Sequence, residues 1–400
     1  MKFFVIGISD EQKPLLPPEV AGVIATHRIF SGGGRHREIM ANRLPDESEW
    51  IDITVPLDAV FNQYQKYDDI VVFASGDPLF YGFANTIRRK LPEAEIIVYP
   101  SFHSLQLLAH RVLLPYHDLH IVSLTGRPWV KFDEALILGY DKIGILTDNR
   151  EHTPAKIVQR MLYYGYDNYT VILGELLGNR EQERVFRLTL EEMADLEFAS
   201  PNVMILIKTR ERERPFGIPD KQFEILPGRP NMMTKMPVRL LTLGMLDLRK
   251  RSVFWDVGSC TGSVSVEAKL QFPHLEIVAF EKRPEGAELL ENNARRWGTP
   301  GIQMVSADFM EVDLSNLPLP DAVFIGGYGG NMARMIDRIL AVIRPGGTIV
   351  FNSVSAESGG QFREILAEKG LSLGQCTRIA VDEHNPIEVM AVEIPHTWRK

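Results

Sequence analysis

Short apolar runs alternate with segments of helical periodicity along this chain of 400 residues. A short apolar run bounded by polar or glycine-containing segments is typical of a buried strand, and apolar positions three or four apart are typical of a helix. In the first half, the apolar runs of strand length are Phe3–Ile8, Ile70–Ala74, Glu95–Tyr99, Leu119–Leu124, Lys142–Leu146 and Thr170–Leu173. Strands that alternate with helices predict an α/β fold and argue against a β-sandwich.

The segment Val253–Ala268 of the second half predicts a strand, a tight turn and a helix in direct succession. Asp256 lies near the carboxyl end of the strand, where open α/β sheets bind ligands. Gly258 and Gly262 allow the backbone to turn sharply and to approach a ligand closely. A dinucleotide-binding turn would carry a third glycine where this chain has Ser263, so we expect an adenosine ligand without phosphates, namely S-adenosylmethionine.

Acidic residues follow the next two apolar runs of the second half. Glu281 comes directly after Ile277–Phe280, at a distance that suits a carboxylate binding two ribose hydroxyls. Asp308 follows a third apolar patch and is a candidate to lie near an adenine amine, although a solvated loop acid is an equal alternative. Further strands are expected at Asp321–Ile325 and Thr348–Phe351. An acid after each of the first three strands is the class I methyltransferase pattern. The alternative is a purely structural α/β domain.

A polar connector separates the two halves. The strand-like run Asn202–Ile207 is followed by the charged run Lys208–Arg214 and then by Pro215, Gly217 and Pro219. Proline, glycine and alternating charges are typical of a solvated linker. We therefore expect one domain at residues 1–210 and a second at 211–400.

Composition limits the possible partners. The formal net charge of −8 argues against a broad nucleic-acid surface, and no apolar run is long enough to span a bilayer. Cys260 and Cys376 are the only cysteines, so we expect a reducing, cytoplasmic location. His103, His110, His117 and His120 lack the carboxylate partners of a metal centre, and no metal is expected. The expected partners are a small-molecule substrate and further copies of the chain.

Gly76-Asp77-Pro78 is the most informative segment of the first half, because it ends a buried apolar run. Geometry alone favours Asp77 as the N-cap of a helix that contains Phe80 and Tyr81. The alternative is a backbone turn that binds a ligand.

The same segment resembles the glycine-aspartate-proline motif of the tetrapyrrole methylases. The motifs that match the cobalamin-pathway branch of that family in order and spacing are Gly32-Gly33-Gly34-Arg35-His36, Gly76-Asp77-Pro78 with Tyr81-Gly82, Pro100-Ser101-Phe102-His103-Ser104, Ser123-Leu124-Thr125-Gly126-Arg127 and Thr147-Asp148. The resemblance implies cofactor contacts at Gly76, Asp77, Ser104 and Leu105 and substrate contacts at Arg35 and His36. The chain departs from the family at Gly7-Ile8-Ser9-Asp10-Glu11, where a glycine-rich loop with a proline is usual.

The second half resembles the decarboxylating precorrin methyltransferases. The matching motifs are Gly217-Ile218-Pro219-Asp220, Met233-Thr234-Lys235, the loop from Asp256 to Gly262, Gly326-Gly327-Tyr328-Gly329-Gly330-Asn331 and Asn352. The implied cofactor contacts are Asp256, Gly258, Ser259, Cys260, Thr261, Gly262, Glu281 and Asp308. The implied substrate contacts are Lys235, Gly326, Gly327, Gly329, Gly330 and Asn352, and Arg239 is a further candidate to clamp a substrate carboxylate. Cys260 replaces the usual middle glycine and is interpreted as a packing variant.

The order of the halves resembles the fused precorrin-6Y C5,15-methyltransferases. This resemblance implies an N-terminal tetrapyrrole methylase fold, a C-terminal Rossmann-like class I domain, and S-adenosylmethionine as methyl donor. The implied reaction methylates precorrin-6Y or its cobalt form at C5 and C15 and decarboxylates the C12 acetate, giving precorrin-8. The alternatives are an RNA methyltransferase and a non-catalytic regulator that binds S-adenosylmethionine.

Overall fold

The computed structural model describes residues 1–229, 232–383 and 385–398, and it divides into two compact units. The first unit contains Met1–Arg127, Tyr140–Gln159 and Asn168–Arg210. The second contains everything from Glu211 onward together with Pro128–Gly139 and Arg160–Asp167. The assignment of these two short segments to the second unit does not follow from the sequence pattern.

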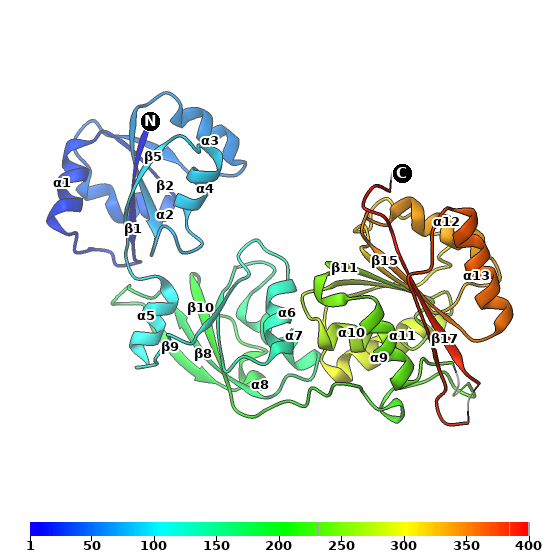
Figure 1. Cartoon of the computed structure of the whole chain (residues 1–400). Coiled ribbons are helices and arrows are strands. Elements are labelled where there is room, and N and C mark those ends of the chain that lie inside the picture. The colour runs from blue at the N-terminus through cyan, green and yellow to red at the C-terminus, as the bar shows by residue number, and fades with distance from the viewer. Residues whose placement is uncertain (230–231, 384, 399–400) are drawn as a thin grey trace. The chain divides into compact units, whose positions relative to one another are not determined.

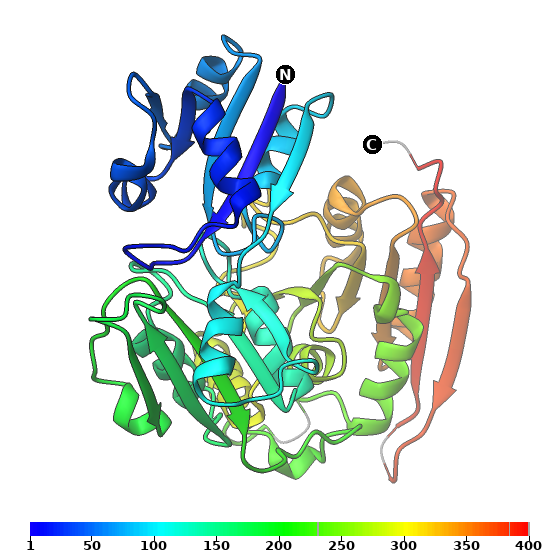
Figure 2. The ribbon, with the colours of Figure 1, turned by 90° about the vertical axis from the view of Figure 1, so that its left-hand side faces the viewer.

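The first sheet is entirely parallel, in the order β3-β2-β4-β1-β5 (Figures 1 and 2). Its strands are β1 Lys2–Ile8, β2 Ile29–Gly32, β3 Glu49–Asp52, β4 Asp69–Ser75 and β5 Glu95–Tyr99. Its helices are α1 Pro18–Thr26, α2 Gly34–Met40, α3 Leu57–Tyr64 and α4 Phe83–Lys90. Buried residues pack on both faces of this sheet, in two separate apolar clusters. A parallel sheet requires this, because helical crossovers cover its two sides.

The second sheet is mixed, in the order β6-β7-β10-β8-β9. Its strands are β6 His120–Ser123, β7 Lys142–Leu146, β8 Tyr169–Glu175, β9 Arg184–Leu188 and β10 Asn202–Lys208. The helices of this stretch are α5 Ser104–Arg111, α6 Val130–Leu138, α7 Pro154–Tyr163 and α8 Leu190–Met193. Strand β10 runs antiparallel to both of its neighbours, and α5 packs against it.

The third sheet forms the centre of the second unit and has the order β13-β12-β11-β14-β15-β17-β16. Its strands are β11 Val253–Val257, β12 Glu276–Phe280, β13 Ile302–Val305, β14 Ala322–Ile325, β15 Thr348–Ser353, β16 Gln375–Ile379 and β17 Ile387–Glu393. Its helices are α9 Met236–Met245, α10 Ser263–Gln271, α11 Pro284–Trp297, α12 Met332–Val342 and α13 Ala356–Glu368. The first five strands are parallel and β17 is antiparallel to β15. The strand order reverses at β11, and such a point is where open α/β sheets bind ligands.

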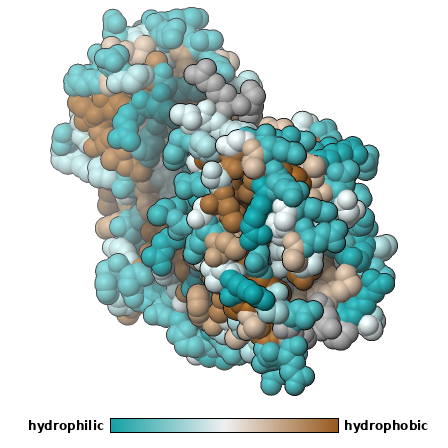
Figure 3. Space-filling view, turned by 45° about the vertical axis from the view of Figure 1, so that its right-hand side comes forward, coloured by the Kyte–Doolittle hydropathy of each residue, from teal (hydrophilic) through white to brown (hydrophobic). Residues whose placement is uncertain are grey.

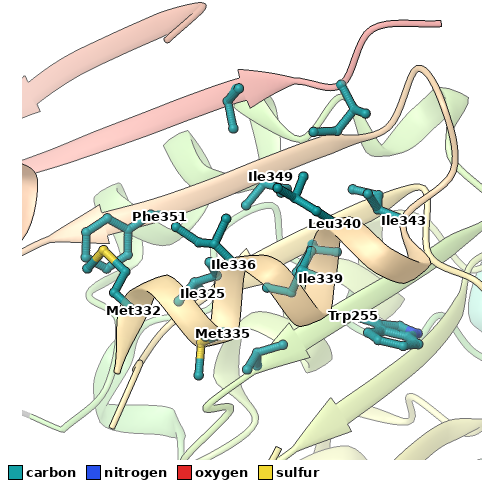
Figure 4. Packing of buried hydrophobic residues seen from close by; sticks show 14 of the residues in the cluster. Trp255, Ile325, Met332, Met335, Ile336, Ile339, Leu340, Ile343, Ile349 and Phe351 are labelled. Carbon is teal, nitrogen blue, oxygen red and sulfur yellow. The ribbon is translucent and has the colours of Figure 1, made fainter. Parts of the chain in front are cut away.

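Helix α12 shows how the sequence builds this core. Its apolar positions recur every three or four residues, and Figure 4 shows Met332, Ile336 and Ile339 facing Ile325 and Phe351 of the sheet. The helix begins where the Asn331 side chain accepts a hydrogen bond from the Arg334 amide. Arg334 and Asp337 of this helix are exposed. On the face of the molecule seen in Figure 3, hydrophilic residues are interspersed with hydrophobic ones.

The structure corrects one prediction for the first unit. Phe80 and Tyr81 lie in a turn, and helix α4 begins only at Phe83. Asp77 therefore does not cap a helix that contains them. Its Oδ1 atom accepts a hydrogen bond from the Leu79 amide at 2.8 Å and so stabilises the turn. The short side chain of aspartate forms this bond two residues ahead with ease.

Candidate active site

The glycine loop after β11 is held by backbone contacts that exclude larger side chains. The amides of Gly258 and Ser259 both donate to the Phe280 carbonyl, which ties the loop to the end of β12. Gly258 has φ +79°, and a Cβ atom there would lie 2.8 Å from the Gly327 nitrogen. A side chain at this position would thus be strained and would separate the two loops.

Asp256 is fully buried beneath this loop. Its Oδ2 atom accepts hydrogen bonds from the amide of Ser265 at 3.2 Å and from its hydroxyl at 2.6 Å. Burial raises the pKa of Asp256 to about 7, against the opposing effect of the Ser265 hydrogen bonds, and the nearby charge of Glu281 adds to the rise. Near neutral pH this carboxyl is therefore populated in both protonation states.

Glu281 follows β12 and is also buried. Its carboxylate accepts hydrogen bonds from the Cys260 amide at 2.9 Å and from the Arg283 amide at 2.9 Å. The Arg283 guanidinium, which is partly exposed, contacts both carboxylate oxygens at 3.1 and 3.2 Å. Glu281 thus joins the glycine loop to the start of α11.

Cys260 lies at φ +53°, a conformation that favours glycine. Its thiol donates to the Met232 carbonyl at 2.9 Å. Burial and then the charge of Glu281 raise the pKa of the thiol to about 11, so it is neutral at physiological pH. This state agrees with a packing role and does not suit a nucleophile.

A cavity of about 500 Å³ opens beside these residues. Its lining contains eleven of the residues that the sequence assigns to the second-half site: Lys235, Asp256, Gly258, Ser259, Cys260, Glu281, Asp308, Gly326, Gly327, Gly329 and Asn352. Thr261, Gly262 and Gly330 do not line it. The cavity therefore brings together segments from the ends of β11, β12, β14 and β15.

Polar groups around the cavity differ in their surroundings. Asp308 is partly exposed and accepts from the Met310 amide at 3.0 Å. That hydrogen bond and Lys282 hold the pKa of Asp308 below its usual value. The amide of Asn352 exchanges hydrogen bonds with the Thr242 hydroxyl.

The prediction that Arg239 clamps a substrate carboxylate is wrong. Its side chain is completely buried and pairs with Glu267 at 3.3 Å and with Asp220 at 3.3 Å. It also donates to the carbonyls of Ile218 and Thr234. A buried guanidinium needs such partners, and here they fix the segment that leads to Lys235 on the cavity wall.

Several residues that line the cavity were not predicted from the sequence. Apolar side chains of Val354, Ile379, Val381 and Ile387 form one wall of the cavity. Val354 directly follows β15, and the other three belong to the hairpin of β16 and β17. No local motif marks them, because their alternation also fits an ordinary hairpin.

In the first unit, the ends of β1, β4 and β5 approach closely. A Cβ atom on Gly7 would lie 1.9 Å from the Gly76 carbonyl oxygen. Gly76 has φ +62°, and its Cβ would lie 2.7 Å from the Cα of His103. The glycine of the Gly76-Asp77-Pro78 motif is thus required by packing.

The other predicted residues of the first unit lie in two places. Arg35 and His36, in α2, both contact the Ser75 hydroxyl. Ser104 begins α5, and His103, not Ser104, is its cap. Leu105 is fully buried.

The described residues contain no cluster of three or more potential metal ligands. Within the described ranges, no helix is both long and apolar enough to cross a membrane.

The second-unit site fits S-adenosylmethionine. Two buried polar atoms of residues that line the cavity, Asp256 Oδ1 and Ser259 Oγ, have no hydrogen-bond partner among the residues that the structure describes. Buried polar atoms are normally paired, so these two suit a ligand that carries hydroxyl and amine groups.

Comparisons with known proteins agree with both halves. Residues 9–194 match the family of tetrapyrrole (corrin/porphyrin) methylases, and residues 229–397 match the precorrin methyltransferase domain. A precorrin-6Y C(5,15)-methyltransferase [decarboxylating] of Sinorhizobium sp is 28% identical over 386 residues, which are 96% of this chain and 91% of that protein. A cobalt-precorrin-6B C(15)-methyltransferase (decarboxylating) of Salmonella typhimurium is 35% identical over 162 residues, which are 40% of this chain and 83% of that protein. A solved precorrin-6Y C5,15-methyltransferase of Geobacter metallireducens is 29% identical, with a TM-score of 0.41 over 45% of this chain and 98% of that structure.

The fold and the cavity define an S-adenosylmethionine-dependent methyltransferase in which a tetrapyrrole methylase half precedes a class I half. The match to the Sinorhizobium protein spans both halves. The chain belongs to the precorrin-6Y C5,15-methyltransferase (decarboxylating) family.

Proposed function

We propose that the two halves divide the reaction on precorrin-6Y, or on its cobalt form, between them. The first half, residues 1–210, methylates C5. The second half, residues 211–400, methylates C15 and removes carbon dioxide from the C12 acetate. The product is precorrin-8.

The observation that carries this division is the second-unit cavity, which combines a cofactor loop with an apolar wall. A relative with the C15-methyltransferase (decarboxylating) name matches only 162 residues, too few for both halves, and this supports placing both of those activities in one half. The matched precorrin methyltransferase domain at 229–397 supports the choice of the second half.

Bound S-adenosylmethionine supplies an electrophilic methyl group, so the protein mainly has to orient donor and acceptor. Glu281 binds the ribose hydroxyls. On the Glu281 carboxylate these hydroxyls take the place of the Arg283 guanidinium. The unpaired Oδ1 of Asp256 accepts a hydrogen bond from the amine. Asp308 accepts a hydrogen bond from the adenine amine. The backbone of Gly258 to Gly262 approaches the cofactor closely.

The opposite part of the cavity binds the macrocycle. Lys235, Asn352 and the amides of the Gly326–Gly330 loop bind its polar periphery, while Val354, Ile379 and Ile387 contact its ring. Apolar surroundings also favour decarboxylation, because the reacting carboxylate loses its hydration while the conjugated ring accepts electrons.

In the first half, Gly76, Asp77, Ser104 and Leu105 bind the cofactor. Arg35 and His36 bind the substrate. The close packing of Gly7, Gly76 and His103 supports a site at this edge of the first sheet.

We further propose a homo-oligomer in the cytoplasm that binds neither nucleic acid nor membrane. Both cysteines are free thiols, which supports a reducing compartment.

The test is to incubate the purified full-length protein with S-adenosylmethionine and precorrin-6Y, or its cobalt form, and to determine the product mass. We expect a gain of two methyl groups and the loss of one carbon dioxide. An unchanged macrocycle with both substrates would contradict the proposal.

A further inference from the structure

Three parallel strands of the first sheet end beside one another and bring four polar side chains together. Strand β4 lies between β1 and β2, and Ser75 is its last residue. Asp10 follows β1, and Arg35 and His36 follow β2 at the start of α2. Because the strands are parallel, their carboxyl ends meet at the same edge of the sheet, and Figure 1 shows β1, β2 and α2 together in the first unit.

His36 donates a hydrogen bond to Ser75. The contact between His36 and Gly33 shows that His36 is the donor. The Gly33 amide donates to His36 Nδ1 at 3.3 Å, so Nδ1 is an acceptor. Burial, and then the charge of Arg35, lower the pKa of His36 to about 4, so the ring is neutral at pH 7. A neutral ring with an accepting Nδ1 carries its hydrogen on Nε2. That Nε2 lies 3.0 Å from Ser75 Oγ.

Arg35 makes a second donation to the same oxygen. Its Nη2 atom donates to Ser75 Oγ at 2.9 Å, and its Nε lies 3.2 Å from Asp10 Oδ1. A hydroxyl oxygen has two lone pairs, and at Ser75 both are used. The hydroxyl hydrogen of Ser75 must then point to a third group, and among the described residues it makes no hydrogen bond of its own.

This geometry selects the kind of ligand. Ser75 is exposed, and the Arg35 side chain beside it is about one-third exposed, at 37%. A hydroxyl that can only donate, next to a guanidinium, is complementary to an anionic acceptor. Two donations into the Ser75 oxygen also polarise its O–H bond and strengthen it as a donor.

We propose that Ser75 and Arg35 form a binding site for a peripheral carboxylate of the tetrapyrrole, with His36 holding the Ser75 hydroxyl in a donating orientation. This site orients the macrocycle for methyl transfer in the first half. The inference rests on the proposed function, in which that half methylates C5.

The test uses the full-length chain with S-adenosylmethionine and a macrocycle already methylated at C15 and decarboxylated, so that only C5 methylation remains. Ser75→Ala should raise the KM for the macrocycle on the order of ten- to hundred-fold. The KM for S-adenosylmethionine and kcat should change little. Ser75→Thr, which keeps the hydroxyl, should stay near the wild type.

Ser48→Ala is the matched control, because Ser48 precedes β3 at the opposite edge of the same sheet. It should leave both KM values unchanged. An unchanged macrocycle KM in Ser75→Ala, or equal losses in Ser75→Ala and Ser75→Thr, would overturn the inference. A rise confined to the KM for S-adenosylmethionine would also overturn it, since the acceptor would then be the cofactor. If the wild type itself adds no methyl group, the assignment of C5 to the first half fails, and the inference fails with it.

Discussion

Replacing Asp256 by asparagine should make the protein more stable at alkaline pH while weakening cofactor binding. The carboxyl is fully buried, and its pKa is raised from 3.8 to about 7. Asparagine has nearly the same shape and can keep its oxygen on Ser265. Its NH₂ group would then occupy the position of the unpaired Oδ1.

The direction in which the free energy of unfolding changes with pH follows from the number of protons bound to the folded and the unfolded protein. Between pH 3.8 and about 7 the folded protein holds the Asp256 proton and the unfolded chain does not. The free energy of unfolding of the wild type therefore falls as pH rises through this window, and the fall is complete above pH 7. A pKa difference of this size corresponds to about 4 kcal/mol. Asp256→Asn has no proton to lose, so its stability relative to the wild type should rise by about this amount between pH 4 and pH 8.

The assay is denaturant unfolding of both full-length proteins over this pH range, followed by tryptophan fluorescence with the transitions fitted separately. Trp255 lies on the same strand as Asp256 and reports on the correct unit. The unpaired NH₂ group adds an offset of about 1–3 kcal/mol that does not depend on pH. Asp308→Asn is the control, because the pKa of Asp308 is lowered from 3.8, so this carboxyl is ionised in both the folded and the unfolded protein above about pH 5 and the stability difference from the wild type should stay constant from there to pH 8. A stability difference between Asp256→Asn and the wild type that is constant with pH would refute the reasoning.

Three further changes test the two cofactor sites. Glu281→Ala should weaken S-adenosylmethionine binding to the second half by about 2–3 kcal/mol, measured by calorimetry, and unchanged affinity would remove Glu281 from the site. Gly258→Val puts a Cβ atom 2.8 Å from the Gly327 nitrogen, so it should stop C15 methylation and carbon dioxide loss, read from the product mass. Carbon dioxide loss that persists in the folded variant would assign decarboxylation elsewhere. Gly76→Val, with its Cβ 2.7 Å from the Cα of His103, should stop C5 methylation even when the C15-methylated, decarboxylated macrocycle is supplied, and C5 methylation by this variant would contradict a first-half site there.

The strands that carry the cofactor loops were predictable from the sequence. The expected runs at Glu95–Tyr99 and Lys142–Leu146 coincide with β5 and β7, and the strand before Gly258 is β11. Strands β2 and β3 were not foreseen, because each contains only one pair of apolar residues, Ile29-Phe30 and Trp50-Ile51, which is too short a run to tell a strand from a loop.

Side-chain roles were harder to predict than strands. Asp77 has the residue type and position of a helix cap, yet the helix begins at Phe83 because the chain first makes a turn. Arg239 has the charge of a substrate clamp, yet Glu267 lies close enough to bind it inside the protein. In both cases the residue type is compatible with two environments, and its neighbours decide between them.

The sequence by itself determined the strand and helix series, the glycine turns and the acids that follow the strands, because these depend on interactions among nearby residues. Only the tertiary structure decided which groups are buried and which lie together. Burial raises the pKa of Asp256, and the hairpin that carries Ile379 and Ile387 reaches the cavity of a loop far earlier in the chain. The contact of Arg35 and His36 with Ser75 likewise requires β2 and β4 to pair. Desolvation and long-range contacts depend on how distant segments pack, and no local pattern of residues encodes that packing.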